Sequence, residues 1–142
     1  MAEDLVAIAW KPIEAFNNGD WDAYRAGIAD DIVSEELATG RTTHGADEDV
    51  ALTGGWKVSF PDGNGTLDAS YVSGDTVIME ITWRGSQTGP FPLLDGTEFP
   101  PSGRRVEMPA VMIATIKDGK VKKVRHLFDL LTMLTQIGAV PK

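Results

Sequence analysis

The sequence predicts an α+β fold in which N-terminal helices cover one face of a curved, mixed or antiparallel sheet. Two observations lead to this prediction. Segments with helical periodicity gather in the first half of the chain, whereas the second half alternates apolar and polar residues between hairpin turns. Such segregation is typical of α+β architecture. With 142 residues, we expect a single domain over residues 1–142.

Three helices are predicted in the first half. Apolar residues recur at helical spacing over residues 3–17, and Pro12 should bend this helix. Asp20 is suited to be the N-cap of a short second helix, and a strand is expected around residues 32–38. A weaker third helix over residues 46–56 has an acidic first turn, but a pair of glycines favours its early end.

The second half is predicted to be an antiparallel meander followed by a short helix. The expected strands lie near residues 66–73, 75–87, 104–117 and 120–129. Tight turns at Gly74 and Gly119 separate strands, and the final apolar helix ends at Gly138. The proline-rich loop over residues 89–103 is either the mouth or lid of a cavity or an inert bulge.

Strand parity assigns side chains to the inner face of the sheet. On the 75–87 strand, the apolar set that includes Met79 and Trp83 faces inward, and Gln87 ends this row. On the next strand, Met108 and Met112 alternate with small residues, which leaves either room for a ligand or a plain core. Parity alone does not decide which face of the last strand is internal.

Composition excludes several classes of function. A net charge of −8 repels phosphate backbones, so no nucleic-acid partner is expected. No apolar run reaches the roughly 20 residues of a bilayer span, so no membrane partner is expected either. The chain has no cysteine, which fits a cytoplasmic location, and its two histidines have no spacing typical of a zinc site.

The chain resembles the SnoaL-like polyketide and ester cyclases, a family of the nuclear transport factor 2-like and ketosteroid isomerase-like fold. The resemblance rests on AFNNGD (15–20), ADDIV (29–33), FPD (60–62), GSQTG (85–89), PSGR (101–104), DGKV (118–121), FD (128–129) and QIG (136–138). It implies a cone-shaped barrel with a deep apolar cavity, a homodimer, no metal and no cofactor. It also implies a small apolar carbonyl substrate, polyketide-like, that undergoes aldol-type cyclisation or isomerisation. Gln87 replaces the family's usual histidine, and an amide does not take up a proton.

Asp129 is the candidate general base, because the resemblance matches it to the catalytic acid of the polyketide cyclases. Burial would raise its pKa toward a useful value. The alternative is that Asp129 caps the final helix, since it directly precedes that helix. If Asp129 points inward, Arg125 shares its face and His126 lies on the outer face, at the expected dimer surface.

Other side chains are candidates for contact with the substrate or the transition state because of their expected position. Gln87 and Arg125 are candidate donors to an enolate oxygen, although Arg125 is equally well explained as an exposed strand residue. The candidate substrate-binding residues are Trp83, Met79, Met108, Met112, Phe16, Trp56 and His44. For His44, a solvated loop position is the alternative.

Two other functions stay open. An epoxide hydrolase of the same fold would need an Asp–Arg–Asp set, of which Arg125 and Asp129 could supply two members. A non-catalytic small-molecule-binding domain is the other alternative. A homodimer is expected through the outer face of the sheet, where Val111, Ile113, Val124 and Phe128 would otherwise form an exposed apolar patch.

Overall fold

The structure, a computed structural model, describes residues 4–140. The helices are α1 (Leu5–Asn18), α2 (Trp21–Ala26), α3 (Ala46–Ser59) and α4 (Leu130–Ile137). The strands are β1 (Ile28–Glu36), β2 (Arg41–His44), β3 (Asn64–Ser73), β4 (Thr76–Ser86), β5 (Phe91–Pro92), β6 (Glu98–Phe99), β7 (Arg105–Lys117) and β8 (Lys120–Phe128). This order confirms the predicted α+β class, and β2, β5 and β6 are additions to the prediction.

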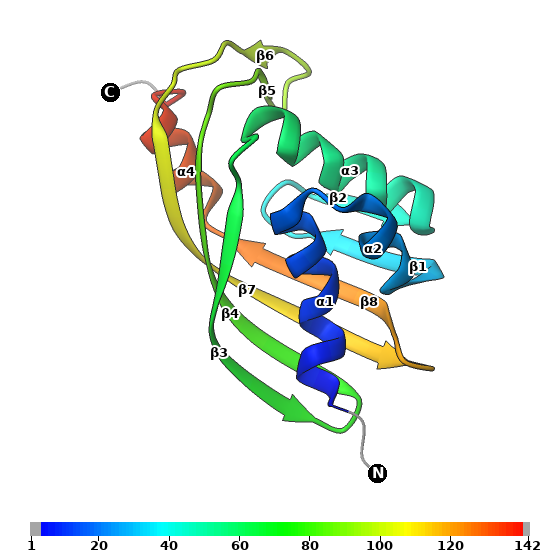
Figure 1. The fold of residues 1–142 in the computed structure, drawn as a ribbon. Coiled ribbons are helices and arrows are strands. Elements are labelled where there is room, and N and C mark those ends of the chain that lie inside the picture. The colour runs from blue at the N-terminus through cyan, green and yellow to red at the C-terminus, as the bar shows by residue number, and fades with distance from the viewer. Residues whose placement is uncertain (1–3, 141–142) are drawn as a thin grey trace.

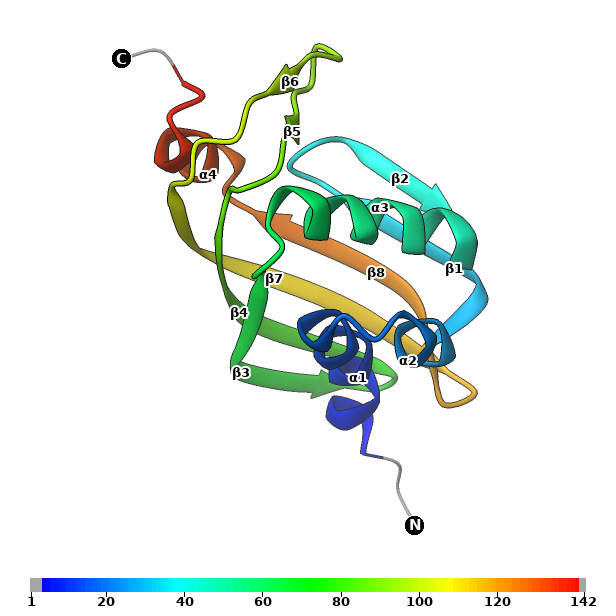
Figure 2. The same cartoon turned by 45° about the horizontal axis from the view of Figure 1, so that its top comes forward.

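A six-stranded mixed sheet in the order β2-β1-β8-β7-β4-β3 forms the body of the molecule. Its neighbouring strands are antiparallel except β1 and β8, which run parallel. The sheet is strongly curved, and α1, α2 and α3 lie across its concave side (Figure 1). The β5–β6 hairpin and α4 lie together at one end of the curved sheet (Figure 2).

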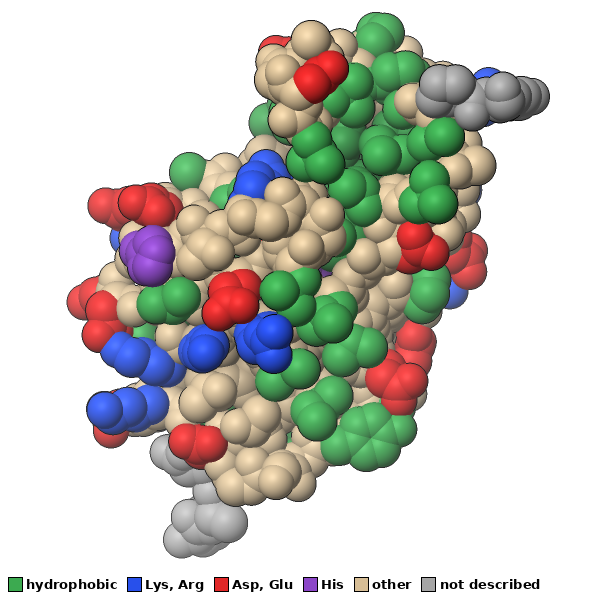
Figure 3. Space-filling view, turned by 180° about the vertical axis from the view of Figure 1, so that it is seen from behind, with side chains coloured by type: hydrophobic (Ala, Val, Ile, Leu, Met, Phe, Trp, Pro, Cys, Tyr) green, Lys and Arg blue, Asp and Glu red, His purple; other side chains and the backbone are tan. Residues whose placement is uncertain are grey.

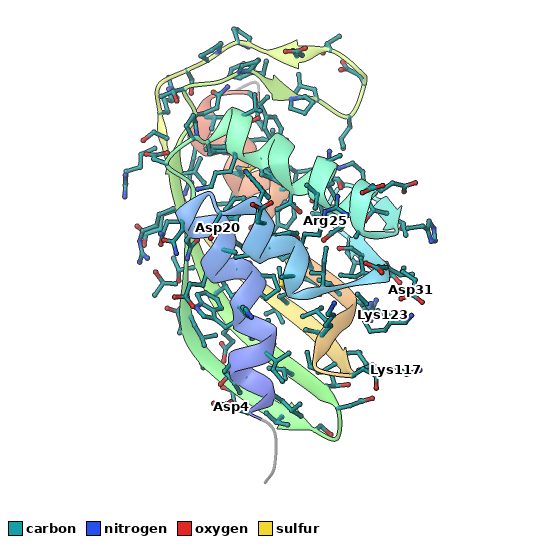
Figure 4. The ribbon with its side chains drawn as sticks, turned by 45° about the vertical axis from the view of Figure 1, so that its right-hand side comes forward. Asp4, Asp20, Arg25, Asp31, Lys117 and Lys123 are labelled. Atoms are coloured by element: carbon teal, nitrogen blue, oxygen red, sulfur yellow. The ribbon has the colours of Figure 1, made fainter. Side chains whose placement is uncertain are left out.

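Side-chain caps fix where the helices begin. Asp4 and Asp20 each accept a hydrogen bond from the backbone three residues on, which satisfies an otherwise free N–H of the first turn (Figure 4). Pro12 lies inside α1, as expected. The expected early end of α3 is wrong, because this helix continues through both glycines to Ser59. Trp56, in the last turn of α3, packs against buried apolar residues in two parts of the core. We attribute the extension of the helix to this burial, which outweighs the low helix propensity of glycine, about 1 kcal/mol per residue.

The predicted inner row of β4 is confirmed. Val77, Met79 and Ile81 are at most 1% exposed and belong to the core between the sheet and α1. A second cluster around Met133 and Ile137 joins α4 to the sheet and to the β5–β6 hairpin. The core therefore lies entirely on the concave side, where the helices cover it.

A bulge in β8 decides the face that parity left open. Ile116 pairs with Val121 but Thr115 pairs with Lys123, so Lys122 is an extra residue in the ladder. This extra residue reverses the alternation, and Val121 and Val124 both face the core. Beyond the bulge, the inner residues are therefore Val124, His126 and Phe128.

Within residues 4–140, no helix has the length and apolar character needed to cross a membrane.

Candidate active site

A cavity of about 140 Å³ lies between the concave face of the sheet and the helices α1, α2 and α3. An engineered apolar cavity of about 150 Å³ holds benzene, so this space is close to the size that holds one aromatic ring. Its walls are mainly apolar, with polar side chains from several elements. The polar or amphipathic lining residues are Tyr24, Ser34, Glu36, Asp49, Thr53, Trp56, Trp83, Arg84 and His126.

His126 projects from β8 into this cavity. Trp83, on β4, donates its indole N–H to Nε2 of His126 at 3.1 Å. Burial lowers the pKa of His126 from 6.5 to about 4, and the negative charge of Glu36 opposes this shift only partly. The imidazole is therefore neutral at neutral pH.

Glu36 is a buried carboxylate, 3% exposed, opposite His126 on the neighbouring strand β1. Its Oε1 accepts hydrogen bonds from Arg41 and from the Thr39 hydroxyl, and its Oε2 accepts one at 2.9 Å from the Trp56 indole. Both oxygens are thus engaged by fixed donors. Glu36 holds Arg41 and Trp56 in position and is a poor proton acceptor.

Asp49 is the second buried carboxylate of the cavity wall, also 3% exposed, and it lies on α3. The Tyr24 hydroxyl donates to its Oδ2 at 2.8 Å, and Thr53 hydrogen-bonds to the same hydroxyl at 3.1 Å. Burial raises the pKa of Asp49, although hydrogen bonds from Tyr24 and Ser34 act against it. Burial, followed by the Asp49 charge, also raises the pKa of Tyr24, so the phenol keeps its proton.

Aromatic rings make up much of the apolar wall. Trp56 contacts Phe60, Phe91 and Phe128 at centroid distances of 5.5–6.2 Å. Phe16 packs edge-on against Trp83 at 5.6 Å. All of these rings except Phe91 line the cavity, so the surroundings of the two acids are largely apolar.

Of the expected substrate-binding residues, five line the cavity: Trp83, Met108, Met112, Phe16 and Trp56. Met79 faces the same way but is fully buried in the core away from the cavity. His44 is exposed at the end of β2, as the alternative interpretation held.

The expectation that Asp129 lines the cavity is wrong. It is exposed and caps α4, accepting hydrogen bonds at 3.0 Å from the backbone N–H of Thr132 and at 2.6 Å from its hydroxyl. These hydrogen bonds hold the pKa of Asp129 below its ordinary value, the opposite of what a general base requires. The reason is the β8 bulge, which turns the alternate residues Arg125 and Leu127 outward.

Gln87 is fully buried but does not line the cavity. Its amide nitrogen donates to the carbonyls of Gly89 and Pro100 at 2.8 and 3.2 Å, and its amide oxygen accepts from the Ser102 N–H at 3.0 Å. A neutral imidazole offers only one donor and one acceptor, so the amide suits this position better than histidine. Gln87 therefore fixes the loop that carries β5 and β6.

Arg125 lies on the outer face and pairs with Glu35 at 3.5 Å. Its assignment to the cavity is wrong for the same reason as that of Asp129. Arg125 and Asp129 therefore do not supply the cavity with two members of the Asp–Arg–Asp set that an epoxide hydrolase would need.

Sequence reasoning missed four polar residues that line the cavity: Tyr24, Glu36, Asp49 and His126. For His126 it favoured the outer face. The alternation of Val124, His126 and Phe128 with charged residues was the available signal. Tyr24 and Asp49 meet across two helices, 25 positions apart, so local spacing gave no sign of their contact. Within residues 4–140, no group of three or more His, Asp or Glu side chains is arranged to hold a metal ion.

Comparison with known proteins places this geometry in a family. The sequence model of the SnoaL-like polyketide cyclases matches residues 8–137. The chain belongs to the SnoaL-like polyketide cyclase family. No curated protein matches it significantly in sequence.

Several solved structures are similar to this member of the family. A candidate SnoaL-like polyketide cyclase from Jannaschia sp. CCS1 is 27% identical with a TM-score of 0.83, over 96% of this chain and 93% of that one. IdmH from Streptomyces antibioticus, a candidate polyketide cyclase, is 26% identical with a TM-score of 0.81, over 96% and 99%. TsrD from Streptomyces laurentii is 26% identical with a TM-score of 0.82, over 99% of both chains. At 18% identity, a protein from Catenulispora acidiphila supports the ketosteroid isomerase-like fold alone.

Proposed function

We propose that this chain is an acid–base enzyme that removes a proton next to the carbonyl group of an apolar, polyketide-like compound. The resulting enolate carbon would then attack a second carbonyl in an aldol-type closure, or take the proton back at another position in an isomerisation. Family membership supports the cyclase class. The mainly apolar cavity supports an apolar substrate.

Asp49 is the proposed general base, in place of Asp129. A base must be ionisable, must reach the substrate, and works best with a pKa near the working pH. Asp49 lines the cavity, and burial raises its pKa toward that range. Glu36 is less suitable because both of its oxygens are occupied by fixed donors.

Tyr24 and Thr53 are proposed to orient the base. The Tyr24 hydroxyl has one proton, which it donates to ionised Asp49, so Thr53 must donate to the Tyr24 oxygen. These two hydrogen bonds hold Oδ2 of Asp49 in place, whereas proton abstraction would use the remaining lone pairs of the carboxylate. The Asp49 side chain would then return the proton to the product, so the carboxylate is regenerated.

The observation that carries the proposal is a buried carboxylate of raised pKa on the wall of an apolar cavity. The test uses 2-tetralone, an apolar bicyclic ketone with acidic protons beside its carbonyl. Proton NMR in D2O should show faster replacement of these protons by deuterium with the protein than with buffer alone. Saturable binding of 2-tetralone without accelerated exchange would support the non-catalytic binding domain instead.

We also propose a homodimer through the outer face of the sheet, but the residues that form its apolar patch differ from those expected from the sequence. Val124 and Phe128 line the cavity and cannot belong to an outer patch. Apolar side chains nevertheless gather on that face beside Lys and Arg side chains (Figure 3). Val111, Ile113 and Leu127 supply such a patch on β7 and β8, and Leu127 is 40% exposed.

A further inference from the structure

We propose that His126 is a catalytic residue that acts as a neutral hydrogen-bond donor, presenting Nδ1–H to the substrate oxygen, with its tautomer fixed by Trp83. This inference rests on the proposed function for the identity of the oxygen, that of a carbonyl becoming an enolate. The tautomer itself follows from the geometry of two side chains and can be tested without any substrate.

The hydrogen bond between Trp83 and His126 determines which nitrogen has the proton. An indole N–H can only donate, so Nε2 of His126 must contribute a lone pair to the 3.1 Å contact. A neutral imidazole has one proton, which must then be on Nδ1. With its lone pair at Nε2 already engaged, His126 is a poor base but a good donor.

Nδ1 of His126 has no hydrogen-bond acceptor among the described residues. Among residues 4–140, no side chain or backbone carbonyl accepts a hydrogen bond from it, although His126 lines the cavity. Both carboxylate oxygens of Glu36, the nearest acid in the ladder, already accept hydrogen bonds from other donors. A donor without a protein acceptor beside an apolar cavity is suited to an oxygen of a ligand.

Trp83 is itself held in the orientation that this contact needs. A Cβ atom built on Gly65 would lie 2.7 Å from Cζ3 of Trp83, so the indole ring occupies the space that only glycine leaves free. Phe16 contacts the ring edge-on from α1. The ring therefore has little freedom to rotate away from His126.

Donor and base would approach the substrate from different parts of the wall. His126 pairs in register with Glu36, whereas Asp49 interacts with Ser34, two residues earlier on the same face of β1. Two residues along a strand span about 7 Å. In the proposed complex, the carbonyl oxygen of the substrate would lie at His126 and its neighbouring C–H group at Asp49.

The first test is nitrogen NMR of histidine-labelled protein without ligand. At neutral pH, the signals of His126 should be those of an Nδ1–H tautomer. Trp83→Phe removes the donor to Nε2, so the Nε2–H form should then gain population. An Nε2–H tautomer in the unaltered protein would overturn the proposal whether or not the enzyme assay succeeds.

The second test is a matched pair of substitutions. His126→Asn keeps an N–H near the Nδ1 position, whereas His126→Gln keeps one near Nε2. We expect the glutamine variant to lose about 100-fold in 2-tetralone exchange, the typical effect of removing one oxyanion donor, and the asparagine variant to recover most of it. The carbonyl infrared band of bound 2-tetralone should rise in frequency with glutamine but not with asparagine.

These outcomes separate the two proposals. Equal exchange rates and equal carbonyl bands in the two variants would overturn the role of His126. Absent exchange in the unaltered protein, combined with the expected difference in the carbonyl band, would overturn the proposed reaction while supporting His126 as the oxygen donor.

Discussion

Trp83 and His126 hydrogen-bond to each other from strands that are not neighbours. Strand β7 runs between them, and the 3.1 Å contact passes over its inner face. The contact joins the apolar wall of the cavity to its polar part. It also fixes His126 as an uncharged group in a chain whose formal net charge is −8.

His126 should make the protein less stable in mild acid. An unfolded histidine takes up a proton near pH 6.5, whereas the folded one does so near 4. Between these values the unfolded chain binds more protons, so the free energy of unfolding falls as the pH decreases, by up to about 3 kcal/mol. Urea unfolding at pH 7 and pH 4.5 measures this loss.

The matched control for that measurement is His126→Asn, which does not titrate. The raised pKa of Asp49 acts in the opposite direction but is common to both proteins. The difference in stability between them should therefore change with pH through the histidine. Parallel curves for the two proteins would show that the pKa of His126 is not lowered by folding.

Gln87→Ala should destabilise the loop between β4 and β7. The substitution leaves the buried Gly89 carbonyl, the Pro100 carbonyl and the Ser102 N–H without their partner. We expect a loss of about 2–4 kcal/mol in the free energy of unfolding and faster proteolysis within residues 88–104. A loss below about 1 kcal/mol, with unchanged proteolysis, would mean that Gln87 does not fix this loop.

Much of the fold could be predicted because its signals are local. Helical periodicity, Asp caps and glycine turns located three helices and the meander correctly. The face of β8 could not be predicted, since Lys122 forms a bulge only through its pairing with β7. Asp49 escaped prediction for a related reason: its partner Tyr24 comes from another helix, and only the folded chain brings them together.

Asp129 should behave as a helix cap in stability measurements. Asp129→Asn retains a side-chain oxygen that can accept from the Thr132 N–H, so the melting temperature should hardly change. Asp129→Ala removes this acceptor and should lower the melting temperature. Circular dichroism melts of both variants provide the comparison, and equal melting temperatures would argue against a capping role.

Dimerisation should depend on Leu127. A lysine there introduces charge into the proposed interface, so Leu127→Lys should shift sedimentation equilibrium toward the monomer at micromolar concentration. Val58→Lys is the control, because Val58 is a more exposed apolar residue on α3, which covers the other side of the sheet. If the unaltered protein is already monomeric, the proposed interface is wrong.

The assignment of the base to Asp49 is tested most directly by 2-tetralone exchange in Asp49→Asn and Asp129→Asn. In the unaltered protein, the rate should rise with pH through the raised pKa of Asp49, because only the ionised form accepts a proton. Asp49→Asn should abolish exchange above buffer while preserving or increasing stability, since a costly buried charge is removed. Asp129→Asn should exchange as fast as the unaltered protein. Full activity in Asp49→Asn with loss in Asp129→Asn would contradict the assignment of the base to the cavity wall.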